Sequence, residues 1–148
     1  SGFTMNPKAV AETMNGKTIM ELKQLAKAKN CAITGSLVIE ELGKFYNRLV
    51  FIFPNGEVRH YNKRHLFTLA GEQQNFEAGN RREIILYKGI RIMPQICYDL
   101  RFPVFSRNNN DYDLLIYVAN WPETRILAWD TLLKARAIEN MSAVIGVN

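Results

Sequence analysis

The apolar and polar positions of the chain divide it into an amphipathic helix followed by a series of strands. Within residues 18–29, Ile19, Leu22 and Ala26 recur at helical spacing. Thr18 and Glu21 fit the T-x-x-E pattern of a capping box. We therefore expect a helix over 18–29 that begins with this box, after a polar loop over 1–16.

Turn signals separate the strands that follow. Strands are predicted over 32–40 and 45–53, joined by residues 41–44. Asn55-Gly56 indicates a hairpin that leads into a strand over 57–62, and Lys88-Gly89 indicates a second hairpin between 83–87 and 90–96. The strand over 45–53 is apolar on both faces, which is typical of sheets covered on both sides. This pattern predicts stacked sheets with outer helices.

The second half of the chain alternates strand and helix. A short helix or turn is predicted over 102–108, a buried strand over 113–120, and a final buried strand over 142–148. A helix is predicted over 125–140, with Ile126, Trp129, Leu133 and Ala137 on one face. The polar segment 63–82 is long for a loop in a compact domain, and such loops are functional or disordered.

Composition is that of a globular protein. The chain has 148 residues, of which 47% are hydrophobic and 22% charged, and this predicts one domain over 1–148. No apolar run is long enough to span a membrane and no signal peptide is visible, so we expect a cytoplasmic protein. The chain starts at Ser1 in what reads as mid-loop and stops inside an apolar strand. We therefore expect it to be part of a longer polypeptide.

The net charge of +5 adds one alternative. The basic residues gather in segment 59–67, which reads equally well as a polar strand end and loop. No nucleic-acid-binding module surrounds it, so a nucleic-acid function would rest on weak binding that salt abolishes. We expect no specific nucleic-acid partner.

Cysteine and histidine usage limits the chemistry further. Cys31 is interpreted as inert packing at the start of a buried strand, and both cysteines are expected to be reduced. His60 and His65 have no cysteine or carboxylate ligand beside them, so no metal site is predicted.

Cys97 is the candidate nucleophile. It lies where an apolar strand gives way to a polar turn, so its side chain can be exposed yet rigidly held. A free thiol has a pKa near ~8.5, so a nucleophilic cysteine needs a base or a cation nearby. Lys63, at a strand end, and Glu72, in the long loop, are candidates. From the residues alone, a lysine at a strand end and a glutamate in a loop are usually solvated side chains.

Five stretches carry a resemblance to a known family. They are "YNKRHLF", "GEQQNFEAGN", "ICYDLRFPVFSRN", "YDLLIYVANWPETR" and "AWDTLLKARAIENMSAVIGVN". In this order the chain resembles the nitrilase superfamily of carbon–nitrogen hydrolases, in its omega-amidase-like branch. The resemblance implies an α+β fold, the nitrilase-like αββα sandwich, here incomplete at both termini. It also implies a Glu-Lys-Cys triad assisted by a second glutamate.

Catalytic roles follow from the resemblance position by position. Lys63 matches the catalytic lysine, although Asn62 replaces the aspartate that often precedes it. Cys97 matches the nucleophile and Glu72 the second glutamate. The first glutamate is expected in a Pro-Glu-Met-Phe-like segment that precedes the stretch matched by residues 1–7. Glu40 and Glu41 lie at the end of a different strand and are not substitutes.

Further positions are assigned as substrate contacts or as structural supports. The predicted substrate-binding residues are Tyr98 (through its backbone N–H), Arg101, Asn120 and Trp121. An aromatic after a strand is often a core residue, and Arg101 can instead pair with Asp99, which we interpret as structural. Helix residues Arg136, Glu139 and Asn140 are expected to brace the helix and a dimer interface.

The resemblance also implies a reaction. We expect hydrolysis of a small carboxylic amide, an omega-amide of a 2-oxo dicarboxylate, to acid and ammonia through a cysteine thioester. No metal or cofactor is expected, and a homodimer is expected for the full-length form. The alternatives are another enzyme of the superfamily, a carbamoylase or a nitrilase, and a non-catalytic interaction protein on the same fold.

Overall fold

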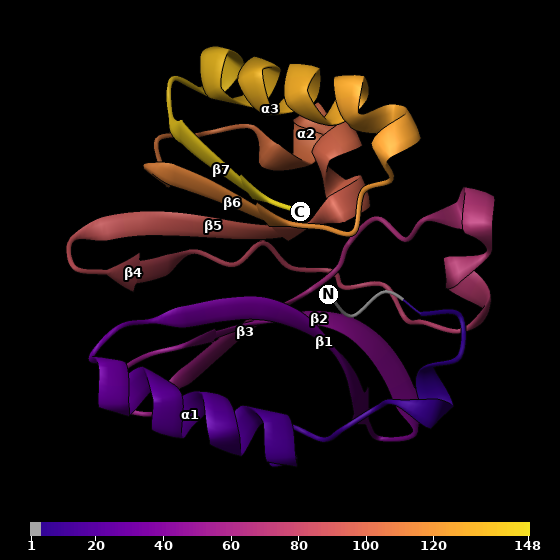
Figure 1. Cartoon of the computed structure of the whole chain (residues 1–148). Helices are drawn as coiled ribbons and strands as arrows, with labels where there is room; N and C mark the ends of the chain where they lie inside the picture. The colour runs from indigo at the N-terminus through magenta and orange to yellow at the C-terminus, as the bar shows by residue number, and fades with distance from the viewer. Residues whose placement is uncertain (1–3) are drawn as a thin grey trace. The chain divides into compact units, whose positions relative to one another are not determined.

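The computed structural model describes residues 4–148, which form two compact units. The first unit ends at Asn80 and the second begins at Arg81. Each unit contains a β-sheet with a helix against it (Figure 1). The predicted α+β class is therefore confirmed, and each unit is described below by itself.

The first unit is a three-stranded antiparallel sheet with one helix. Its elements are the 3₁₀ turn η1 (Pro7–Ala9), α1 (Lys17–Lys29), β1 (Ile33–Glu41), β2 (Lys44–Ile52), β3 (Val58–Asn62) and the 3₁₀ turns η2 (Thr68–Ala70) and η3 (Glu72–Gln74). The strand order is β1-β2-β3, with Ile33 opposite Ile52. Both hairpins form as predicted. Gly56 has φ +87° in the second, where its N–H donates to Phe53 O at 2.9 Å.

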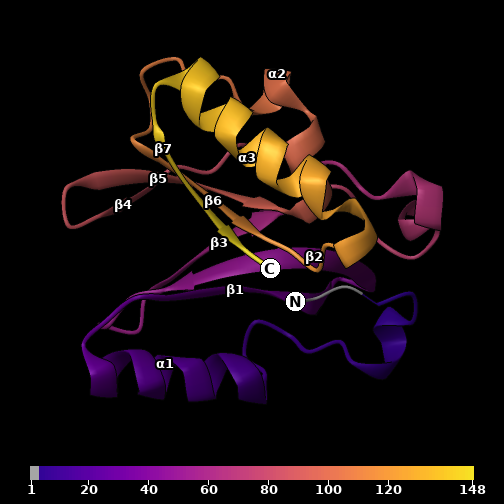
Figure 2. The ribbon, with the colours of Figure 1, turned by 45° about the horizontal axis from the view of Figure 1, so that its top comes forward.

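Helix α1 covers one face of this sheet in both views (Figures 1 and 2). Ile19 and Ala26 on the helix pack with Val50 and Ile52 of β2 in one apolar cluster. The helical stripe that the sequence predicts is therefore the stripe that meets the sheet.

The predicted capping box of α1 is wrong. The helix begins one residue earlier, with Gly16 as its N-cap, so Thr18 lies inside the first turn. The cap comes from outside the helix, because Glu12 accepts hydrogen bonds from the Thr18 N–H (2.9 Å) and from the Thr18 hydroxyl. Those bonds hold the pKa of Glu12 below its usual value. Glu21 instead faces Lys17 in an exposed ion pair.

The second unit is a mixed four-stranded sheet. Its elements are β4 (Ile85–Tyr87), β5 (Ile90–Ile96), η4 (Cys97–Arg101), α2 (Pro103–Ser106), β6 (Leu114–Val118), η5 (Glu123–Arg125), α3 (Ile126–Asn140) and β7 (Ala143–Val147). The order is β4-β5-β6-β7, antiparallel between β4 and β5 and parallel beyond. Lys88 and Gly89 both have positive φ, as a tight hairpin requires.

Helix α3 lies against this sheet (Figure 2). Trp129 is buried in a core that includes Met93, Leu115 and Tyr117, and Leu133 packs against that core. The predicted apolar face is only partly correct, because Ile126 is 38% exposed. The polar residues Arg136 and Asn140 are buried on α3.

Two predictions of burial are wrong. The final strand β7 exists, but it is the outer strand of its sheet, and Ile145 and Val147 are about half exposed within the described chain. Cys31 is also exposed, because it follows the C-cap of α1, Asn30, and precedes β1. Its N–H donates to Ala26 O at 3.2 Å, a bond that caps the C-terminal end of the helix.

Candidate active site

Lys63 lies directly after β3, and the backbone on both sides holds it. Its N–H donates to Asn47 O at 2.9 Å, and its carbonyl accepts the Gly79 N–H at 2.8 Å. The side chain is 1% exposed. Lysine is almost never this buried unless it is paired, so its partner decides how it is interpreted.

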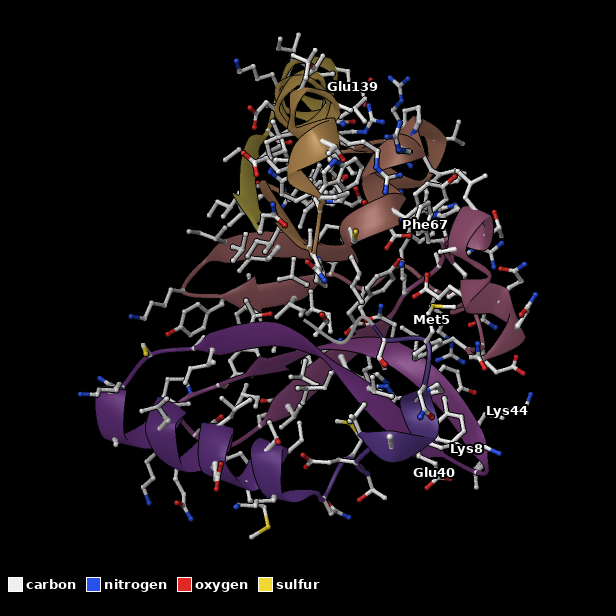
Figure 3. The ribbon with its side chains drawn as sticks, turned by 45° about the vertical axis from the view of Figure 1, so that its right-hand side comes forward. Met5, Lys8, Glu40, Lys44, Phe67 and Glu139 are labelled. Atoms are coloured by element: carbon white, nitrogen blue, oxygen red, sulfur yellow. The ribbon has the colours of Figure 1, made fainter. Side chains whose placement is uncertain are left out.

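That partner is Glu72, which opens the turn η3 in the long loop. Its Oε2 accepts Lys63 Nζ at 2.7 Å and the Phe67 N–H at 2.5 Å. Its Oε1 accepts Asn47 Nδ2 at 3.2 Å. The carboxylate is fully buried, and its hydrogen bonds offset the cost of removing it from water. Figure 3 shows Phe67 in this loop.

A buried ion pair of this kind is a functional-site candidate. Two buried charges stabilise a fold little compared with apolar residues of the same volume, so stability alone does not account for them. An ammonium has three N–H donors, and a lysine that shares one with Glu72 can also donate to a developing oxyanion. The sequence alternative, in which both residues are solvated, is wrong.

Asn47 belongs to the same cluster and was missed by the sequence analysis. Its backbone accepts from Lys63 and its side chain donates to Glu72, so it contacts both members of the pair. The only signal available was a polar residue inside the apolar run of β2, where buried polar groups require partners.

Cys97 lies at the junction of β5 and the turn η4. It is half-buried and has φ +46°, in the left-handed region. This conformation costs a non-glycine residue about 1–2 kcal/mol. Strained backbone of this kind persists where the surrounding structure imposes it, and it is common at active sites.

Residues that follow Cys97 in the sequence stabilise this part of the chain. The buried Asp99 accepts the Ile96 N–H at 3.0 Å, which agrees with the structural role expected for it. The Tyr112 hydroxyl donates to Ser106 O at the end of α2. Burial raises the pKa of Tyr112 to about 12, so this phenol remains a donor at neutral pH.

The predicted substrate contacts lie in the same unit as Cys97. Tyr98 is half-buried, Asn120 is exposed just after β6, and Arg101 is exposed. The Arg101 guanidinium lies 5.1 Å from the ring centroid of Trp121. Trp121 is itself a buried core residue, and its Nε1 donates to Arg125 O at 2.9 Å.

The structure therefore brings Lys63 and Glu72 together in the first unit, and Arg101 and Trp121 together in the second. Cys97 belongs to the second unit. Cys31 and Cys97 do not form a disulfide. Over residues 4–148, no three His, Cys, Asp or Glu side chains gather where they could hold a metal ion.

The sequence profile of carbon-nitrogen hydrolases matches residues 2–148. The chain belongs to this family. Two curated members illustrate the relationship. Omega-amidase YafV of Escherichia coli (strain K12) is 47% identical over 150 residues, which is 100% of this chain and 57% of the relative. The 2-oxoglutaramate amidase of Bacillus subtilis (strain 168) is 34% identical over 131 residues, which is 86% of this chain and 51% of the relative.

Solved structures agree with the family assignment. A carbon-nitrogen hydrolase superfamily protein from Xanthomonas campestris, with an arsenic adduct in its active site, is 44% identical and has a TM-score of 0.94. The match covers 99% of this chain and 58% of that one. Nit3 of Saccharomyces cerevisiae, a nitrilase-superfamily member, has a TM-score of 0.85 at 24% identity, which shows the shared fold. The chain spans between half and three fifths of these relatives' lengths.

Proposed function

We propose that the chain carries the nucleophile and the lysine of a cysteine-dependent amidase that acts on a small carboxylic amide. The observation that carries the proposal is the Lys63–Glu72 pair, joined at 2.7 Å with both side chains almost completely buried. The pair lies in a chain 47% identical to an omega-amidase, at the two positions assigned catalytic roles from sequence.

The proposed reaction proceeds through a thioester. A carboxylate takes the proton of the Cys97 thiol, and the thiolate attacks the amide carbonyl. Lys63 with the Tyr98 N–H stabilises the tetrahedral oxyanion. The C–N bond breaks as a carboxylic acid delivers a proton to the leaving nitrogen, which departs as ammonia. The resulting carboxylate then activates a water, which cleaves the thioester to the acid and regenerates the thiol. Glu72 orients Lys63, and the reaction needs no metal or cofactor.

The proton carrier is proposed to be the glutamate that the family resemblance places in a segment before the stretch matched by residues 1–7. The substrate is proposed to be an omega-amide of a 2-oxo dicarboxylate, which the names of the two curated relatives support. Tyr98, Arg101, Asn120 and Trp121 are proposed substrate contacts. The cytoplasmic location, the homodimer and the single domain over 1–148 remain predictions. No helix of residues 4–148 combines the length and apolarity that a membrane span requires.

The test is ammonia release by a polypeptide that contains residues 1–148 together with the preceding glutamate segment. We expect turnover of a 2-oxo dicarboxylate omega-amide, and little turnover of an N-carbamoyl amino acid or a nitrile. Cys97→Ser should abolish it. Lys63→Ala should lower it by at least roughly 10²–10³, and Lys63→Arg should also be poor because a planar fork does not replace a compact ammonium. Turnover of a folded Lys63→Ala variant within tenfold of the parent would rule out the oxyanion role.

A further inference from the structure

The turn that carries Cys97 is held at both of its ends. At its start, the Asp99 carboxylate accepts the Ile96 N–H at 3.0 Å. At its end, Arg136 Nη2 donates to Leu100 O at 2.6 Å. The second bond comes from α3, which is 36 positions further along the chain, so the turn is fixed by an element outside its own segment.

Arg136 is an unusual residue to find at this contact. It is 3% exposed, and its Nε has no hydrogen-bond partner among the described residues. Removing a guanidinium from water is costly, and an unpaired buried donor leaves part of that cost uncompensated. An apolar side chain could pack α3 against the turn without this cost. An apolar side chain could not donate the hydrogen bond to the Leu100 carbonyl.

The surroundings fix the position of the Arg136 side chain. Its Nη1 donates to Glu139 Oε1 at 2.9 Å, one helical turn along α3. Asn140 Nδ2 donates to the Arg136 carbonyl at 2.9 Å, and Asn140 Oδ1 accepts the Asn108 N–H at 2.9 Å. The guanidinium therefore reaches the turn from a helix end that is itself tied to the loop after α2.

We infer that Arg136 is a positioning residue that, through Leu100 O, keeps the Cys97 thiol and the Tyr98 N–H in their reactive arrangement. The inference rests on the proposed function, in which Cys97 is the nucleophile. Cys97 has φ +46°, a conformation from which an unsupported turn would relax. Leu100 lies three residues after Cys97 in the same turn. A shift of the backbone at Leu100 would therefore also move the backbone that carries the thiol.

The test measures the thiol rather than turnover. Cys97 is alkylated with iodoacetamide over a pH series and its rate is read by peptide mapping, with the exposed Cys31 as an internal reference in the same sample. In the parent we expect the alkylation of Cys97 to reach half its maximal rate at a pH well below ~8.5, the pKa of an ordinary thiol. In Arg136→Met we expect the midpoint to rise toward that value and the Cys97-to-Cys31 ratio at pH 7 to fall several-fold. Arg136→Lys should recover part of the loss.

Arg82→Met is the matched control. Arg82 also donates to a carbonyl, that of Arg107 at 3.1 Å, and pairs with a carboxylate, Asp111 at 2.9 Å. The Arg82→Met variant should leave the pH midpoint of Cys97 alkylation unchanged. An unchanged midpoint in a folded Arg136→Met variant, or an equal shift in Arg82→Met, would overturn the inference.

Two further outcomes are also decisive. If Arg136→Met does not fold, Glu139→Ala takes its place, since it removes one bond that orients the guanidinium. It should shift the midpoint in the same direction, and no shift would overturn the inference. A parent Cys97 with an ordinary midpoint would refute the proposed nucleophile, and the positioning role with it, whereas an activated parent with an unresponsive Arg136 refutes the positioning role alone.

Discussion

Substitutions in the Lys63–Glu72 pair are expected to affect the stability of the chain and its turnover differently. Glu72→Gln removes one charge and leaves the other buried without its counterion. Breaking a buried pair in this way costs about 3–5 kcal/mol. We therefore expect Glu72→Gln to lower the free energy of unfolding by that amount in denaturant titrations. The double variant with Lys63→Met should recover part of the stability but none of the turnover.

The exposed pair Lys17–Glu21 provides the control. Its side chains are 86% and 64% exposed and the N–O distance is 3.7 Å. Exposed helical pairs are worth about 0.3–0.5 kcal/mol, so Glu21→Gln should change the free energy of unfolding by no more than that. If Glu72→Gln proved equally mild, the burial of the pair would be the wrong explanation of its energetics.

At the residue scale, the sequence predicted which residues form the candidate site better than it predicted their burial and backbone conformation. The family motifs placed Lys63 and Glu72, and the structure joins them. The positive φ of Cys97 could not be predicted, because local propensity would assign that conformation to glycine. The bracing role expected of Arg136 did not identify its partner, because the contact with the Leu100 carbonyl joins residues 36 positions apart.

At the scale of elements, the approach of the long loop to the end of β3 depends on Gly79. A Cβ at this position would lie 2.2 Å from Asn62 O, which is backbone and cannot move aside cheaply. The Gly79 N–H also donates to the Lys63 carbonyl. We expect Gly79→Ala to push the loop away from β3, destabilise the chain and reduce turnover through displacement of Lys63. Thermal unfolding and the ammonia assay measure the two effects.

Gly35→Ala is the matched control, because a Cβ at Gly35 in β1 has no atom within 4 Å. It should leave stability and turnover close to the parent values, since a strand tolerates alanine at least as well as glycine. Equal effects of the two substitutions would show that the cost at Gly79 is not steric.

The elements themselves were predictable where the signal is local. The hairpins at Asn55-Gly56 and Lys88-Gly89 formed, because both need residues that tolerate positive φ and the sequence supplies them. The capping box failed because Glu12, six positions upstream of Thr18, provides the cap instead. The exposure of β7 was unpredictable for a different reason, since an edge strand and a central strand can have the same apolar sequence.

At the scale of the whole molecule, the expectation of a single domain depends on size. In the described chain, the two compact units span residues 4–80 and 81–148. A single core in a domain below about 70–80 residues rarely supplies more than about 3–5 kcal/mol. Neither unit is therefore expected to be stable by itself, although each has its own sheet and helix.

We therefore expect residues 1–148 to unfold in one cooperative transition. Both tryptophans, Trp121 and Trp129, lie in the second unit, so tryptophan fluorescence reports on that unit alone. Far-UV circular dichroism reports on both units, and the two denaturant curves should coincide. Gly79→Ala, which lies in the first unit, should shift the tryptophan curve as far as the dichroism curve, while Gly35→Ala should move neither. A tryptophan curve that ignores Gly79→Ala, with a split dichroism curve, would mean that the two units unfold independently and that the chain is two domains rather than one.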